Sequence, residues 1–207
     1  MNIARLVQEF AILAPPFLLA ITAHEFAHGY VAYRLGDPTA ARLGRLTFNP
    51  LKHLDLFGVV AFFIMKIGWA RPVPVDPRYF KEPGRDMVWV SLAGIGANCG
   101  LAVACGVLVR LFAMTAGVVP MYFLYPLLHM LAAGVWINLM LAIFNLIPVP
   151  PLDGSRVLLH FLPARFAAGY EKLEPFGFLI LLALFYAGAI EKIMVPLISV
   201  AQRLLLG

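Results

Sequence analysis

Two histidines four positions apart, with a glutamate between them, are the residues of this chain best suited to chemistry: His24, Glu25 and His28. On a helix, positions i and i+4 point the same way, so the two imidazoles can bind one Zn²⁺ ion. Glu25 lies on the neighbouring face, where it can accept a proton from an attacking water. The motif is short and also occurs by chance in proteins that bind no metal, so its surroundings decide what it means.

The motif lies in a segment that has the composition of a membrane-spanning helix. Between Phe10 and Tyr33 the only formal charge belongs to Glu25. A carboxylate and two imidazoles in hydrocarbon cost several kcal/mol on most scales. That cost favours a functional site over a chance match.

Composition agrees with a membrane protein, because 62% of the residues are hydrophobic and only 13% are charged. The net charge of +5 comes from basic residues that are scattered rather than gathered in a run. Anionic headgroups and the positive-inside bias explain this charge better than a nucleic-acid partner does. The length of 207 residues suits one bundle of several spanning helices, so we predict a single integral-membrane domain over residues 1–207.

Uncharged stretches predict the positions of the spans. Three are long enough to cross a bilayer: 10–33, 87–109 and about 122–147, with a turn near 115–120 between the last two. The stretch between Glu174 and Glu191 is short for a span, but it suffices if flanking side chains extend to the interface. The predicted fold is therefore an all-α polytopic membrane protein, a bundle of about four transmembrane helices.

Three segments are predicted to depart from straight spanning helices. Pro15 and Pro16 are expected to break or kink the start of the first span. Residues 193–207 contain a proline and an arginine and favour an interfacial or half-inserted helix. Residues 54–67 suit a re-entrant segment better than a full crossing, which adds a re-entrant or β-like loop on the cytoplasmic side of the bundle.

Basic residues predict the orientation of the bundle. The segment 36–86 holds half of all Lys and Arg residues, namely Arg42, Arg45, Lys52, Lys66, Arg71, Arg78, Lys81 and Arg85. The connection 113–121 holds none. By the positive-inside rule, 36–86 and 148–174 are cytoplasmic and the N-terminus is outside. The C-terminal ends of the first and third spans then lie on the same side of the membrane.

Two histidines leave zinc one protein ligand short, because catalytic sites normally have three protein ligands and a water. The best candidate is Asp153, which follows three prolines in the segment from Asn145 to Gly154. Backbone broken by prolines is tolerated at membrane depth only where protein or a watery cavity covers it. Gly154 is expected to allow a tight turn behind Asp153. A plain helix-ending turn at the membrane surface is the alternative, and the histidine motif on the same side favours the ligand.

The two motifs together, His-Glu-Phe-Ala-His at 24–28 and Asn-Leu-Ile-Pro-Val-Pro-Pro-Leu-Asp-Gly at 145–154, resemble the site-2 protease family of intramembrane zinc metalloproteases. The stretches 44–53 and 68–75 look like loops of its compact bacterial and archaeal members, which lack PDZ and CBS domains. The resemblance implies that His24, His28 and Asp153 bind one zinc ion per chain and that Glu25 is the general base. It also implies a prokaryotic cell membrane, and the orientation predicted from the basic residues places the active site towards the cytoplasm.

The family also has a glycine-rich segment with an asparagine that assists substrate or transition-state binding, and Gly94-Ile95-Gly96-Ala97-Asn98 resembles it in part. The usual proline after the first glycine is Ile95 here, a departure that bears on the role of Asn98. Asn138 and Asn145 lie seven apart, hence on one helix face. They can orient ligands or hold an extended substrate, with Asn145 the candidate for substrate binding, or they can be polar contacts between helices.

The remaining histidines have ordinary interpretations beside functional ones. His53 is a candidate fourth metal ligand, although a hydrogen-bonded loop histidine is the commoner case. His129, in the middle of a span, can line a water path or form an interhelical hydrogen bond, and the second is favoured. His160 is expected at the interface.

The leading hypothesis is a zinc endopeptidase that cleaves peptide bonds in or near transmembrane segments of membrane proteins. A spanning substrate must unwind first, and pairing with an edge in residues 44–80 is a plausible way to hold it extended. The alternatives are a zinc-binding, non-proteolytic scaffold or transporter, and a protease that trims lipidated peptides. A scaffold or transporter has no need of a general base such as Glu25. A protease that trims lipidated peptides would have its third ligand, a carboxylate, on a later helix rather than in a proline-aspartate turn.

Overall fold

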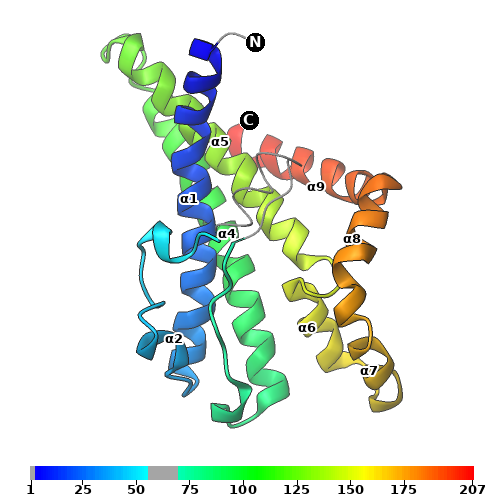
Figure 1. Cartoon of the computed structure of the whole chain (residues 1–207). Coiled ribbons are helices and arrows are strands. Elements are labelled where there is room, and N and C mark those ends of the chain that lie inside the picture. The colour runs from blue at the N-terminus through cyan, green and yellow to red at the C-terminus, as the bar shows by residue number, and fades with distance from the viewer. Residues whose placement is uncertain (1–2, 56–69) are drawn as a thin grey trace.

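The computed structural model describes residues 3–55 and 70–207 of the chain. Within them, three helices are long and apolar enough to cross a membrane: α1 (Ile3–Arg34), α4 (Pro83–Ala113) and α5 (Met121–Leu146). They match the three long predicted spans to within a few residues. Figure 1 shows α1 running down from the N-terminus, α4 returning upwards and α5 descending again. The end of α1, the start of α4 and the end of α5 therefore share one side, as predicted.

Helix α1 does not break at its two prolines, so of the predicted break or kink only the kink stays a prediction. It runs from Ile3 to Arg34 with Pro15 and Pro16 inside it. The backbone hydrogen bonds that a proline removes can be spared in a spanning helix where neighbouring helices cover the freed backbone groups. Pro16 lies against α5, because a Cβ added to Gly134 would be 3.6 Å from the Pro16 Cβ.

Between α1 and α4 the described residues, 35–55 and 70–82, form short elements rather than a sheet. They are α2 (Thr39–Arg42) and two 3-10 turns, η1 (Pro50–Lys52) and η2 (Pro77–Tyr79). The β-like character predicted for this region amounts, in the part of the chain that the structure describes, to one antiparallel bridge between Leu54 and Ala70. The predicted re-entrant segment 54–67 lies, beyond its first two residues, outside the described part.

After α5 the chain turns into short helices. They are α6 (Asp153–Phe161), α7 (Ala164–Glu171), η3 (Glu174–Phe176), α8 (Gly177–Tyr186) and α9 (Ala189–Leu206). The pair from Glu174 to Leu206 is apolar enough for a fourth span but is bent by 74°. Gly188 makes the bend with a φ of +68°, which a residue without Cβ adopts at little cost.

Helix α9 packs on the bundle through one face, and its predicted interfacial or half-inserted position in the membrane stays a prediction. Its Ile190, Met194 and Ile198 form one buried cluster with Cys105 of α4 and Val135 of α5. The opposite face of α9 leaves large apolar side chains exposed, including Ile193, Val195, Leu197 and Val200. Such a helix is covered by protein on one face and suits lipid on the other.

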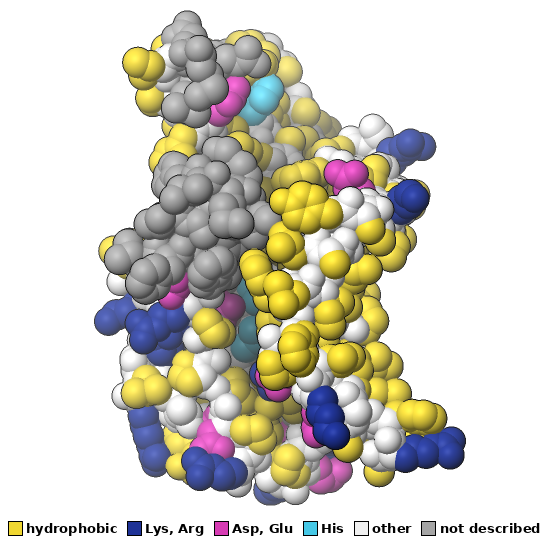
Figure 2. Space-filling view, turned by 45° about the vertical axis from the view of Figure 1, so that its right-hand side comes forward, with side chains coloured by type: hydrophobic (Ala, Val, Ile, Leu, Met, Phe, Trp, Pro, Cys, Tyr) yellow, Lys and Arg dark blue, Asp and Glu magenta, His cyan; other side chains and the backbone are white. Residues whose placement is uncertain are grey.

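Basic side chains on the surface gather toward one end of the molecule. Figure 2 shows most of the visible Lys and Arg side chains toward the lower end, while hydrophobic side chains cover much of the surface above. The lower end is where α1 ends and α4 begins in Figure 1.

Candidate metal centre

Helices α1 and α6 bring three ligand-type side chains together. His24 and His28 lie one turn apart on α1, with their Nε2 atoms 2.9 Å from each other. Asp153, the first residue of α6, has its Oδ2 atom 3.2 Å from both Nε2 atoms. Both histidines are only 8% exposed. The cluster is the one group in the described residues whose ligand atoms are close enough for a common metal ion.

Very close backbone packing between the end of α5 and the start of α6 places Asp153 beside the two histidines. A Cβ on Gly154 would collide with the carbonyl oxygen of Leu146, the last residue of α5. A Cβ on Gly177, the first residue of α8, would likewise collide with the carbonyl oxygen of Pro150. Gly154 lies inside α6 and is not among the glycines with positive φ, so the expected tight turn is wrong. This glycine is needed because α6 starts directly against the end of α5.

Helix α4 lies directly on the two imidazoles at Gly94. A Cβ at this position would be 2.5 Å from the His28 Nε2 atom and 2.7 Å from the His24 Cε1 atom. Real Cβ atoms do not approach other atoms so closely, so any larger residue displaces at least one ring. In contrast, a Cβ on Gly96 would meet nothing within 4 Å.

Hydrogen bonds to the other ring nitrogens define the tautomer of each histidine. The Nδ1 atom of His28 lies 2.7 Å from the carbonyl oxygen of Val90, which can only accept. The Nδ1 atom of His24 lies 2.6 Å from the Oδ1 atom of Asn98. Both histidines therefore donate from Nδ1 and keep a lone pair on Nε2, as metal-binding histidines do.

The orientation of the Asn98 amide is settled by its other contacts. Its Nδ2 atom donates to the Ala20 carbonyl oxygen at 3.1 Å and to the Asn138 Oδ1 atom at 2.9 Å. Asn138 in turn donates to the Gly134 carbonyl oxygen at 2.8 Å. Asn98 is fully buried, so this network fixes the His24 ring through α4 and α5.

The cluster has the donor set that a divalent metal ion requires. Two Nε2 lone pairs and a carboxylate oxygen face one another, and the Asp153 Oδ2 atom is buried without a hydrogen-bond donor among the described residues. Three acceptors at this spacing repel one another unless a cation lies between them. Ligand atoms around tetrahedral Zn²⁺, with bonds of about 2.0 Å, lie roughly 3.3 Å apart. The residues present therefore fit zinc.

Glu25 is held by a segment that reaches α1 from the loop region. Its Oε2 atom accepts a hydrogen bond of 2.8 Å from the backbone N–H of Val73. Two further hydrogen bonds hold the same extended segment at its ends. The Asp76 N–H donates to the Asp37 Oδ2 atom at 2.7 Å. The Arg71 N–H donates to the His53 carbonyl oxygen at 2.8 Å. The sequence alone carried no signal that Val73 or Asp37 contributes to this arrangement.

Other predicted residues lie apart from the cluster. Asn145 donates from Nδ2 to the Leu141 carbonyl oxygen of its own helix and has no bond to the three ligand-type residues. His53 is fully buried and its Nε2 atom bonds to the Thr47 carbonyl oxygen, so it shapes the loop, the ordinary interpretation.

Two histidines further along the chain also have local roles. The Nδ1 atom of His129 bonds to the Tyr125 carbonyl oxygen one turn earlier in α5, and the described residues show no interhelical bond of the kind favoured from the sequence. His160 is exposed at the end of α6 and contacts Gly84.

Comparison with known proteins agrees with this geometry. Residues 12–188 match the model of peptidase family M50. The chain is 38% identical over 201 residues to "Putative zinc metalloprotease YwhC" of Bacillus subtilis, a match that covers 89% of this chain and 84% of that protein. It is 29% identical over 191 residues to "Putative zinc metalloprotease Rip2" of Mycolicibacterium smegmatis, covering 90% and 71%. No solved structure matches the chain.

The family match spans both halves of the metal cluster, the α1 histidines and the start of α6. The non-proteolytic scaffold or transporter is not favoured by these relatives, whose names describe zinc metalloproteases. The chain belongs to peptidase family M50, the site-2 protease family, and is an intramembrane zinc metalloprotease.

Proposed function

We propose that His24, His28 and Asp153 hold one catalytic zinc ion and that Glu25 is the general base. The observation that carries this assignment is the meeting of two Nε2 lone pairs and the Asp153 carboxylate within 3.2 Å. No described donor satisfies that carboxylate oxygen, so the cluster is prepared for a cation.

Zinc in such a site acts as a Lewis acid that polarises the scissile carbonyl and lowers the pKa of water. The protein positions the proton acceptor. One oxygen of the Glu25 carboxylate is engaged by the Val73 N–H. The other oxygen can accept a proton from the attacking water and return it to the leaving amine. Because the Val73 bond fixes the carboxylate, little reorganisation is needed when the proton moves.

The two asparagines have different proposed roles. Asn98 orients His24 through its 2.6 Å bond, and its effect on the transition state passes through that ring. Asn145 lies in the last turn of α5, just before the chain turns toward Asp153. Its half-buried amide is the candidate contact for the backbone of a bound peptide.

We infer that the substrate is a membrane protein with a transmembrane segment, and that it binds in an extended form. The segment from Arg71 to Asp76 offers such a strand few donors, because positions 72 and 74 are prolines and the N–H groups of Arg71, Val73 and Asp76 are already bonded. The N–H groups of residues 46–48 have no backbone partner among the described residues. They are the better candidates for pairing with a substrate.

The remaining proposals concern the setting. The whole chain acts as one membrane-embedded peptidase domain with its active site open to the cytoplasmic side of a prokaryotic cell membrane. Support comes from the basic residues of 36–86 and from the shared side of the ends of α1 and α5.

The test is incubation of the purified protein with a panel of tagged peptides, with and without a chelator. The panel holds a spanning helix, the same helix with a central Gly-Pro pair, and a short lipidated peptide. We expect chelator-sensitive cleavage of the spanning peptides, faster with the helix-breaking pair. Cleavage of the lipidated peptide alone would favour the trimming alternative, and intact peptides with zinc bound would favour a scaffold.

A further inference from the structure

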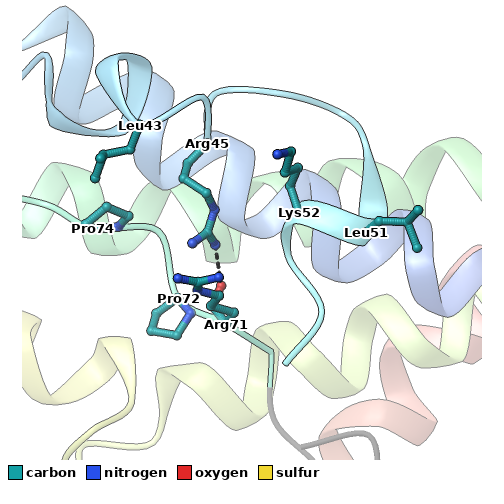
Figure 3. A pocket seen from close by; sticks show the side chains of 7 residues that line it. All are labelled: Leu43, Arg45, Leu51, Lys52, Arg71, Pro72 and Pro74. Atoms are coloured by element: carbon teal, nitrogen blue, oxygen red, sulfur yellow. Dashed lines mark hydrogen bonds between the residues drawn. The ribbon is translucent and has the colours of Figure 1, made fainter. Parts of the chain in front are cut away.

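A pocket with a basic lining lies beside α1, between the loop that follows α2 and the extended segment before α4. Its cavity of about 590 Å³ is lined by Leu43, Arg45, Leu51, Lys52, Arg71, Pro72 and Pro74, which we call the basic pocket. Figure 3 shows the loop that carries Leu43 to Lys52 on one wall and the extended segment from Arg71 to Pro74 on the other. Three of the seven side chains are cationic and none of the seven is acidic.

Arg45 is the buried cation of the basic pocket. It is 8% exposed, and one terminal nitrogen donates to the Arg71 carbonyl oxygen at 2.7 Å. Its Nε atom is buried without an acceptor among the residues that the structure describes. Burial, and after it the positive charge of Arg71, lower the pKa of Arg45. An oxyanion in the pocket would satisfy the free N–H and offset the repulsion between the two guanidinium groups.

The lining indicates which anion suits the pocket. Arginine forks and a lysine ammonium match the several oxygens of a phosphate group. Pro72 and Pro74 offer no N–H, so recognition depends on the charged side chains. Leu43 and Leu51 at the rim are 63% and 75% exposed, which is unfavourable in water and suits hydrocarbon.

We propose that the basic pocket binds the phosphate group of an anionic phospholipid, with Arg45, Lys52 and Arg71 around the phosphate and Leu43 and Leu51 against the acyl chains. Inorganic phosphate shares the charge chemistry but has nothing for the apolar rim. Clusters of Lys and Arg next to spanning helices attract anionic headgroups in this way.

Occupancy of the basic pocket has a consequence for the metal centre. A lipid that bridges its two walls restrains Arg71, and two residues later the N–H of Val73 holds Glu25. Bound lipid therefore stabilises the position of the proposed general base. Only this consequence rests on the proposed function. The binding itself is independent of Glu25 chemistry and can be measured in an inactive variant.

The experiment uses the full chain carrying Glu25→Gln, in a nonionic detergent. Native mass spectrometry follows titration with short-chain phosphatidylglycerol, with phosphatidylcholine of equal chain length, and with inorganic phosphate. We expect phosphatidylglycerol to bind at least about tenfold more tightly than phosphatidylcholine. Arg71→Gln should weaken that binding by about tenfold or more, as loss of a charge-assisted contact does. Arg71→Gln is preferred to Arg45→Gln because the Arg71 side chain is exposed and the Arg45 side chain braces the loop.

The matched control is Arg42→Gln, which removes the same charge from an exposed position at the end of α2, just before the loop and outside the lining. It should leave lipid binding unchanged. Equal binding of the two lipids, or equal effects of Arg71→Gln and Arg42→Gln, would overturn the proposal. Inorganic phosphate that binds as tightly as phosphatidylglycerol would exclude the lipid as the source. Displacement of phosphatidylglycerol by an acidic peptide, with loss of acidic-peptide cleavage in Arg71→Gln, would make the pocket a substrate site instead.

Discussion

At the scale of single residues, three side chains of the proposed metal centre are each oriented by a hydrogen bond on the side away from the cluster. His24 depends on Asn98, His28 on the Val90 carbonyl and Glu25 on the Val73 N–H. Each bond leaves the opposite atom of the side chain free for chemistry. A change at any of these partners should therefore alter a different measurable property.

Glu25→Gln should separate metal binding from catalysis. The amide keeps the size of the side chain but cannot accept the proton, so zinc content should stay near one ion per chain. Cleavage should drop by about 10²–10⁴-fold, the usual contribution of a general base. Metal analysis and peptide cleavage measure the two effects, with Asp153→Ala as the contrasting variant that should lose zinc. Near-normal cleavage in Glu25→Gln would remove Glu25 from the proposed role.

Asn98→Ala should weaken zinc binding without removing any ligand. The His24 ring loses the acceptor that fixes its tautomer, and such outer partners are worth about 10–100-fold in metal affinity. Competition with a zinc-sensitive chelator dye measures the change. Asn138→Ala removes a neighbour of Asn98 but leaves the bond from Asn98 to His24 intact, so it should cost less affinity. If Asn98→Ala and Asn138→Ala behave alike, the 2.6 Å bond does not orient the ring.

At the scale of elements, the helices position the site through glycines, which have no side chain, as much as through the side chains that bind. α4 can approach the imidazoles because residue 94 is glycine, and α6 can start against the end of α5 because residue 154 is glycine. The short segment 71–76 approaches α1 from the other side and engages Glu25. The site therefore lies where α1, α4 and α6 meet.

Gly94→Ala should disrupt the metal centre while Gly96→Ala should not. The added methyl at 94 would lie 2.5 Å from the His28 Nε2 atom, whereas at 96 it meets nothing within 4 Å. Both changes raise helix propensity by the same amount, roughly 1 kcal/mol, so the comparison isolates the contact. Zinc content and cleavage of the two purified variants give the result. Full zinc in Gly94→Ala would show that α4 can move away from the rings.

At the scale of the whole molecule, the arrangement of the helices and the distribution of charge both bear on the predicted orientation. The ends of α1 and α5 share one side, and the segment 36–86 that follows α1 in the sequence carries half of the basic residues of the chain. The connection between α4 and α5 is on the opposite side and has none. A site at the lower end of the bundle in Figure 1 would open toward the basic side.

Single cysteines should report this orientation in intact cells, in a background without Cys99 and Cys105. Both test positions are exposed, so access to the side chain is not limiting: Lys81→Cys near the start of α4 and Val118→Cys after its end. An impermeant thiol reagent should label Val118→Cys from outside, and Lys81→Cys only after the membrane is opened. The reverse pattern would place the basic side and the active-site opening outside. Retained peptide cleavage in both variants is the control for folding.

The sequence by itself determined the features that lie within one element. Helical spacing put His24 and His28 on one face, and runs of uncharged residues predicted α1, α4 and α5, because both patterns depend only on local geometry and hydrophobicity. The sequence did not show that α1 continues through Pro15 and Pro16, because the cost of a lost backbone hydrogen bond depends on what packs alongside the helix. The resemblance of two distant motifs also pointed to Asp153, which the structure brings to the histidines.

Only the tertiary structure decided which residues surround these side chains. Val73 lies 48 positions from Glu25, Val90 lies 62 from His28 and Asn98 lies 74 from His24. The basic pocket likewise joins two walls through the bond from Arg45 to Arg71. No local pattern encodes such pairs, because each exists only when separate elements pack at one distance and angle. The requirement for glycine at 94 and 154 has the same origin, a close approach of the backbone to the imidazoles at 94 and to another backbone at 154, which a single sequence cannot reveal.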